Sequence, residues 1–267
     1  VTSREHLRLQ AEWVLAVPGL PFPHEKSAGD VEQFGAVRLF VERARQVESA
    51  FCLSEATRAA VVRICQLVEG SPLGIELAAC SLGVSSCEQI ATAIERGLDA
   101  LTTTMRDVPQ RHRSMRAVLD HSWKLLCAEE QLVFQRLSVF RGGFEAPAAQ
   151  EIALGTPALL AQLVSKSLLR REPSGRYQVH ELPRQYAAEH LGAGAEGEQV
   201  RARHCQYYLS FLHGQEACLK AGQQKSALRE IGAEVDNIRA AWQWATMQGS
   251  LEMIAAALDS LYLFYWA

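Results

Sequence analysis

From residue 36 onwards, apolar side chains recur at every third or fourth position of this sequence. In the stretch AVRLFVERARQV, one helix face would carry Val37, Phe40, Val41 and Ala44. Ser54 is suited to cap the start of the next helix, and Pro72 to occupy the first turn of the one after it. A chain with this pattern is restricted to a mainly α fold, and residues 36–101 are predicted to form about four helices.

The helical pattern is broken once, by a short hairpin pattern. The stretch LLRREPSGRYQVH has the turn residues Pro173, Ser174 and Gly175 in its middle. Several short helical patterns precede it, with RGGF between two of them predicted as a tight turn. This order predicts a winged helix over residues 111–192, with a two-stranded wing.

Beyond the wing, the stretch GAGAEGE is predicted to be a linker, and the chain then returns to helices. EVDNIRAAWQWATMQG and SLEMIAAALDSLYLFYW predict an antiparallel helix pair broken at Gly249. Helix pairs of this length are the unit of α-solenoids, so residues 193–267 are predicted to begin a helical repeat domain resembling tetratricopeptide (TPR) repeats.

The composition excludes some classes of protein. The formal net charge of −3 argues against binding to nucleic acid or membrane surfaces, and no apolar run is long enough to span a bilayer. The seven cysteines form no CxxC pair, which favours reduced, buried thiols in a cytoplasmic protein. Because the chain starts on VTSREHL without Met and ends on the apolar LYLFYWA, we expect it to continue at both ends in a longer protein.

Three motif tests are negative. GAGAEG at 192–197 fits the dinucleotide fingerprint GxGxxG, but a helix rather than a strand is predicted before it. HELPRQ at 180–185 lacks the second histidine of a zinc-protease motif. The phosphate-binding pattern GxxxxGK[ST] occurs nowhere, so the chain as given lacks the parts for ATP hydrolysis, and we predict no catalytic residue and no metal ligand.

Three residues remain as candidates, each with an ordinary structural alternative. Arg4 follows a short strand-like stretch, where a surface arginine is the simpler interpretation. Pro72 in GSPLGIELAA suits plain helix initiation. His180 ends the strand pattern of YQVH, where a structural histidine is common.

Taken in order, these stretches resemble the STAND-type signalling NTPases, relatives of NB-ARC proteins, and in particular their bacterial transcription-regulator branch. TSR at 2–4 resembles the family's sensor motif, and GSPLGIELAA its GLPLA motif. RHRSMRAVLDHSWKLL, EEQLVFQRLSVFRGGF and LVSKSLLRR are similar to its winged helix, and EVDNIRAAWQWA to the opening of its repeats. YQVHELPRQYAAEHL carries the position of the family histidine. The resemblance covers nearly the whole chain.

The resemblance implies four domains and a set of nucleotide contacts. Residues 1–21 would be the remnant of an α/β nucleotide-binding domain, 22–110 a helical lid, 111–192 the winged helix and 193–267 the start of the repeats. In the longer protein, Arg4 would sense the γ-phosphate, Pro72 with Leu73 would pack on adenine, and His180 would contact the β-phosphate of ADP. That protein would bind ATP or ADP with Mg²⁺ and be a slow ATPase, whereas this chain alone is expected to hold no nucleotide tightly.

Two positions depart from the family pattern. Ser71 stands where the family usually has Leu, and Gly74 where it usually has Ala. Both substitutions are expected to loosen the lid helix.

Three hypotheses for function follow. The first is the regulatory part of a nucleotide-controlled switch that governs assembly or transcription. The second is a DNA-binding winged helix, but residues 111–192 hold 11 Lys and Arg against 8 Asp and Glu, a net of +3, and the helix of LLAQLVSKSLLRR is mostly apolar. This charge census argues against direct DNA binding. The third is a scaffold that binds protein partners through its helical repeats, with self-assembly on activation.

Overall fold

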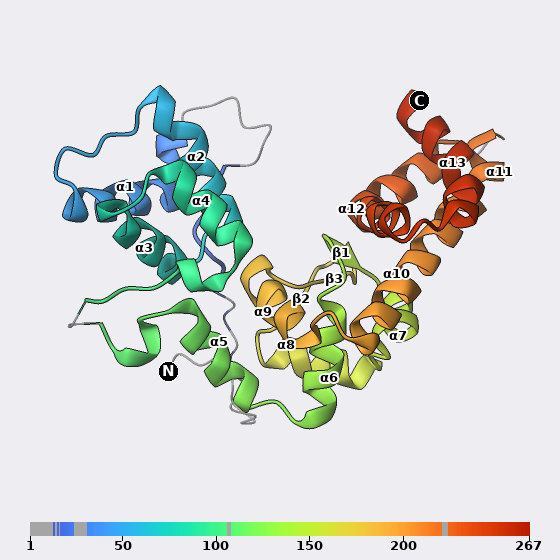
Figure 1. Cartoon of the computed structure of the whole chain (residues 1–267), viewed down its shortest axis with the longest axis horizontal. Coiled ribbons are helices and arrows are strands. Elements are labelled where there is room, and N and C mark those ends of the chain that lie inside the picture. Colours follow the sequence, from blue (N-terminus) through green and yellow to red (C-terminus); the bar gives the residue numbers. More distant parts are fainter. Residues whose placement is uncertain (1–12, 14, 16, 24–30, 106–107, 221–223) are drawn as a thin grey trace. The chain divides into compact units, whose positions relative to one another are not determined.

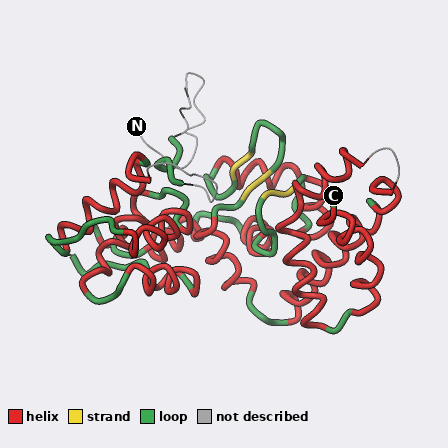
Figure 2. Tube along the Cα trace, turned by 90° about the horizontal axis from the view of Figure 1, so that it is seen from above, coloured by secondary structure: helices red, strands yellow, loops and turns green. Residues whose placement is uncertain are grey.

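The computed structural model describes residues 13, 15, 17–23, 31–105, 108–220 and 224–267. It is mainly helical with one small antiparallel sheet, which confirms the predicted fold class (Figures 1 and 2). Contacts divide the described chain into two compact units. The N-terminal unit comprises the residues up to Leu126 together with His180–Tyr186, and the C-terminal unit comprises Cys127–Val179 and Ala187–Ala267. The four domains predicted from the sequence remain a prediction.

The N-terminal unit is built from helices that local signals define. Its elements are η1 (Val31–Gln33), α1 (Gly35–Val47), α2 (Glu55–Leu67), α3 (Pro72–Cys80), η2 (Ser81–Gly83), α4 (Cys87–Arg96), η3 (Leu98–Ala100), η4 (Gln110–His112) and α5 (Met115–Lys124). As predicted, Ser54 caps α2: its hydroxyl accepts a hydrogen bond from the amide of Thr57, whose hydroxyl accepts one from the amide of Ser54. The core between α1–α4 includes the fully buried Phe40, Ile64, Ile75 and Ile94.

The C-terminal unit carries the sheet and the long helices. Its elements are α6 (Ala128–Leu137), β1 (Gly143–Phe144), α7 (Ala146–Ala153), α8 (Pro157–Ser165), β2 (Arg170–Arg171), β3 (Tyr177–Gln178), α10 (Ala195–Gly214), α11 (Glu216–Lys220), α12 (Gln224–Gln248) and α13 (Leu251–Trp266). Helix α9 (Glu181–Leu191) begins in the N-terminal unit and ends in this one.

The wing has three strands rather than the predicted two. Gly143–Phe144, predicted as part of a tight turn, forms β1 and pairs with β3, so the strand order is β1–β3–β2. Phe144 is fully buried and lies opposite Tyr177. The turn itself is at Gly142, whose φ of 68° is accessible to glycine at little cost.

The predicted linker at 192–198 is wrong in its second half, because α10 begins at Ala195. Gly197 lies inside this helix, and a Cβ there would approach the carbonyl oxygen of Gly192 to 2.5 Å. The glycines of GAGAEG therefore allow α9 and α10 to join closely. A helix precedes this motif, as predicted, so it lacks the strand that a dinucleotide site requires.

Two further expectations can be compared with the structure. All seven cysteines are free, but Cys52 and Cys127 are exposed, so the prediction of buried thiols is wrong for these two. Within the described ranges, no helix combines the length and the apolar character needed to cross a membrane.

Candidate functional site

The turn between α2 and α3 is held in an unusual backbone conformation. Glu69 has a φ of 47° and Gly70 a φ of 66°. The amide of Leu20 donates to the carbonyl oxygen of Gly70 at 2.8 Å, and a Cβ at Gly70 would meet the carbonyl oxygen of Leu20 at 2.0 Å. Only glycine fits there. For Glu69 the left-handed conformation costs about 1 kcal/mol, so the surrounding contacts must hold it in place.

Helix α3 starts directly after this turn, as predicted. The hydroxyl of Ser71 accepts a hydrogen bond from the amide of Gly74 at 3.3 Å, and Pro72 is the first residue of the helix. Pro72 is exposed and therefore free to contact a ligand, whereas Leu73 is half-buried and packs against the core of the N-terminal unit.

The two departures from the family pattern have local explanations. Ser71 caps α3, which a leucine would not do. A Cβ at Gly74 would lie 2.9 Å from Cβ of Val68, so the glycine allows close packing of the turn. The expectation that these residues loosen the helix stays a prediction.

His180 contacts the side chain of Glu69. Its Nδ1 lies within hydrogen-bond distance of Oε2 of Glu69, while Oε1 of the same carboxylate accepts a hydrogen bond from the amide of Glu181 at 2.8 Å. The carboxylate therefore contacts both the imidazole and the backbone amide of the first residue of α9. We call this arrangement of Glu69, His180 and Glu181 the Glu69 corner.

The start of α9 is fixed to α5 by further contacts. The hydroxyl of Tyr186 donates to Oδ1 of Asp120 at 2.7 Å, and the ring of Tyr186 lies edge-on to that of Trp123, with centroids 5.9 Å apart. Leu182 is buried in the same core. These contacts give the corner a defined place within the N-terminal unit.

The predicted site residues are thus partly brought together. Glu69 lies three positions before Pro72 and contacts His180, so two motifs that are far apart in the sequence meet at one turn. Arg4 lies outside the described residues. Glu69 was not among the predicted site residues, although its position immediately before Gly70 places a carboxylate close to the start of α3.

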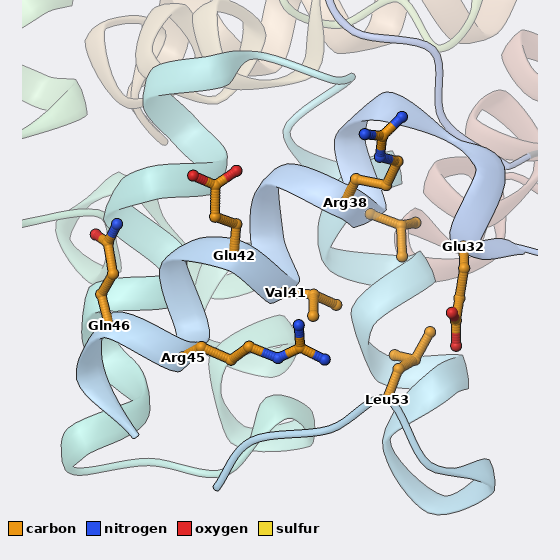
Figure 3. Close-up of a pocket in the computed structure, with 8 residues that line it drawn as sticks. Glu32, Arg38, Val41, Glu42, Arg45, Gln46 and Leu53 are labelled. Atoms are coloured by element: carbon orange, nitrogen blue, oxygen red, sulfur yellow. The ribbon is translucent and has the colours of Figure 1, made fainter. Parts of the chain in front are cut away.

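The described surface also has a cavity of about 600 Å³ on the outer side of α1. Figure 3 shows charged side chains, among them Arg38, Glu42 and Arg45, around the apolar Val41 and Leu53. None of the predicted site residues lines it. Among the described residues, no group of three or more His, Cys, Asp or Glu side chains is arranged to hold a metal ion.

Comparison with known proteins identifies relatives but no family model that matches. Proteins named "Putative HTH-type transcriptional regulator" in Mycobacterium bovis and Mycobacterium tuberculosis are 33% identical to this chain over 270 residues. The alignment covers 97% of this chain and 29% of each regulator. An uncharacterized protein of M. tuberculosis is 30% identical over 214 residues, which are 76% of this chain and 52% of that protein. The chain therefore spans less than a third of the length of the regulators, and nearly all of it is similar to them.

Proposed function

We propose that this chain is the regulatory part of a nucleotide-dependent switch that controls transcription or assembly. The observation that carries the proposal is the contact between Glu69 and His180, which joins the turn before Pro72 to the start of α9. The names of the mycobacterial relatives support a role in transcription regulation. This chain covers 29% of each regulator, which leaves room in those proteins for further domains.

The chemistry of the Glu69 corner suits a switch. An imidazole N–H and a backbone amide at a helix start are both donors to anions, and Glu69 now supplies two carboxylate oxygens to them. A phosphate group of ADP would accept from the same donors. We infer that ADP and Glu69 compete for His180 and that the exposed ring of Pro72 packs on the adenine beside Leu73.

In this proposal the chain itself carries no catalytic residue. ATP, ADP and Mg²⁺ would be held mainly by the longer protein, in which Arg4 would contact the γ-phosphate and slow ATP hydrolysis would reset the switch. His180 and Pro72 would report which nucleotide is bound.

The proposal is tested by titrating ADP into the full-length protein. His180→Ala should weaken ADP binding at least tenfold, because one phosphate contact is lost. His121→Ala, which removes an exposed histidine from the same unit, should leave the affinity unchanged. Equal affinity of His180→Ala and the unmodified protein would refute the role of His180, and absence of any ADP binding would refute the switch.

Direct DNA binding is less well supported. The exposed positions of α8 are Pro157, Ala158, Ala161 and Gln162, which carry no positive charge. Lys166, just beyond the helix, pairs with the buried Glu130 at 2.6 Å. A helix that reads a DNA groove normally presents several Arg, Lys, Asn or Gln side chains. If this chain bound DNA with an affinity that falls steeply as the salt concentration rises, direct DNA binding would be favoured over the nucleotide-dependent switch.

Protein binding through the helical repeats is favoured by a separate observation. An apolar groove of about 440 Å³ lies between α12 and α13, lined in part by Trp242, Met247 and Phe264. Grooves of this kind accept the apolar face of a partner helix. Met247→Lys should therefore reduce any self-association seen by sedimentation, whereas Leu154→Lys, at another exposed apolar residue, should not.

A further inference from the structure

The cavity on the outer side of α1, which we call the α1 cavity, has an apolar floor. Val41 of α1 and Leu53 of the segment before α2 line it, and both half-buried side chains pack against the core of the N-terminal unit. The core therefore fixes the floor in place. The volume of about 600 Å³ lies within the usual range of small-molecule sites, roughly 300–1,000 Å³.

The guanidinium of Arg45 is held beside this floor. Its Nε donates a hydrogen bond to the carbonyl oxygen of Phe51 at 3.2 Å. Phe51 is buried, and its ring lies edge-on to that of Phe40, with centroids 6.1 Å apart. Figure 3 shows the side chain of Arg45 extending past Val41 toward Leu53. Because a guanidinium carries further N–H donors in the same plane, the bond to Phe51 leaves the Nη groups available to a ligand.

Both arginines that line the cavity lack an acidic partner. Arg38 lies two turns before Arg45 on α1, and within the described parts of the chain neither side chain forms an ion pair. Arg43, on another face of the same helix, pairs with Glu76 of α3 at 2.9 Å. The arginines at the cavity are therefore the ones on α1 whose charge no described carboxylate neutralises.

The two glutamates of the cavity lie apart from the guanidinium of Arg45. Figure 3 shows the carboxylate of Glu42 directed away from it, and that of Glu32 on the far side of Leu53. With two arginines and two glutamates around it, the cavity has no net formal charge. A neutral rim does not favour a polyanion such as nucleic acid. A ligand with a single negative group and an apolar body matches both Arg45 and the floor.

We propose that the α1 cavity binds an apolar carboxylate, which is a molecule that joins one carboxylate to an apolar body. The carboxylate accepts hydrogen bonds from the Nη groups of Arg45, and the apolar body covers Val41 and Leu53. Arg38 adds a second positive charge at the rim. A free acyl carboxylate and the C-terminus of an apolar peptide both have this chemistry. The cavity shares no residue with the Glu69 corner, so this binding is separate from the nucleotide-dependent switch.

Isothermal titration calorimetry of this chain with octanoate tests the proposal. One octanoate should bind per chain, because it supplies both the carboxylate and the apolar body. Acetate lacks the apolar body and octan-1-ol lacks the charge, so each should bind at least tenfold more weakly than octanoate. If octan-1-ol binds as tightly as octanoate, the arginines do not select a carboxylate and the proposal is wrong.

Variants show whether octanoate binds in the α1 cavity. Arg45→Gln should weaken octanoate binding at least tenfold, because the charge-assisted hydrogen bonds are lost. Arg38→Gln should weaken it about two- to threefold through the loss of one exposed charge. Arg96→Gln, at an exposed arginine of α4, is the matched control and should leave the affinity unchanged.

The variant Arg38→Gln decides the matter if Arg45→Gln does not fold, because Arg38 has no described partner whose loss would disturb the fold. If these variants bind octanoate as tightly as the unmodified chain, octanoate binds elsewhere and the proposal fails.

Two peptides distinguish the possible sources of the carboxylate. They are acetyl-Ala-Val-Leu with a free C-terminal carboxylate and the same peptide with a C-terminal amide. Tighter binding of the free acid than of octanoate would identify a peptide C-terminus, and the reverse order would identify an acyl carboxylate; both results support the proposal. It is overturned if the amide binds as tightly as the free acid, or if neither octanoate nor the free acid binds.

Discussion

The Glu69 corner and a second cluster both join segments that are far apart in the sequence, but they differ in burial. The second cluster consists of Arg176, Glu234 and Asn237, and we call it the α12 clasp. His180 and Glu69 have side chains that are 42% and 25% exposed, so water competes for their contact. Asn237 is fully buried, and Arg176 and Glu234 nearly so. An exposed ion pair contributes little to stability, whereas a buried polar group that loses its partner is costly. We therefore expect another ligand to replace the contact between Glu69 and His180 readily, and we expect the contacts of the α12 clasp to persist.

The largest effect is expected from removing the buried amide of the clasp. Asn237→Ala leaves the amide of Arg141 and the carbonyl oxygen of Gly143 without this partner, and it should lower the free energy of unfolding by about 4 kcal/mol. Urea denaturation followed by circular dichroism would measure this. Gln243→Ala, at an exposed position of α12, is the control and should change it by less than about 0.5 kcal/mol. If Asn237→Ala lowers the free energy of unfolding by less than about 1 kcal/mol, the α12 clasp does not stabilise the fold more than the Glu69 corner does.

Acid should weaken the region around the clasp through His204. The pKa of His204 is lowered to about 4, chiefly by burial; the hydrogen bond that its Nε2 donates to Oδ1 of Asn237 opposes this shift, and the positive charge of Arg141 adds to it. Because the folded chain favours the neutral imidazole, its contribution to stability is complete above pH 6.5 and is lost as the pH falls towards 4. The loss should reach about 3 kcal/mol.

The variant His204→Phe separates the contribution of His204 to the loss of stability in acid from that of other groups. Other groups also titrate in this range, so the measured quantity is the difference in unfolding free energy between the two proteins at pH 7 and at pH 4.5. The ring of Phe should keep the edge-on contact with Phe140 and remove the acid-dependent part of the loss. Parallel pH profiles for the two proteins would show that His204 is not the titrating group.

A smaller effect is expected at the turn that carries Glu69. Gly74→Ala would bring a methyl group within 2.9 Å of Val68, which should cost about 2 kcal/mol even though alanine favours helices by about 1 kcal/mol. Thermal unfolding would measure the change. If the variant is more stable than the unmodified chain, then Val68 moves aside easily and the turn is less tightly packed than described.

The smallest effect is expected from the corner itself. His180→Ala should change the free energy of unfolding by less than about 1 kcal/mol, because the contact with Glu69 is half-exposed. His121→Ala gives the baseline for losing an exposed histidine of the same unit. A loss as large as that of Asn237→Ala would mean that the corner is a structural contact rather than an exchangeable one.

Local features of the fold were predictable from the sequence, and long-range ones were not. Ser54 and Pro72 start helices through atoms within a few residues of themselves, so their patterns sufficed. Strand β1 was missed because two residues form a strand only by pairing with β3. The same limit applies at the candidate site: His180 was visible as the end of a strand pattern, but its partner Glu69 is 111 positions away. Asn237 looks like an ordinary helix residue until the turn at Gly143 covers it.

The central claim is that Glu69 occupies the donors of His180 and Glu181 until nucleotide replaces it. The measurement that tests it most directly is the affinity of the full-length protein for ADP when the competing charge is removed. Glu69→Gln should bind ADP three- to tenfold more tightly than the unmodified protein, while Glu55→Gln, at an exposed position of α2, should bind it equally. Unchanged or weaker binding by Glu69→Gln would contradict the account.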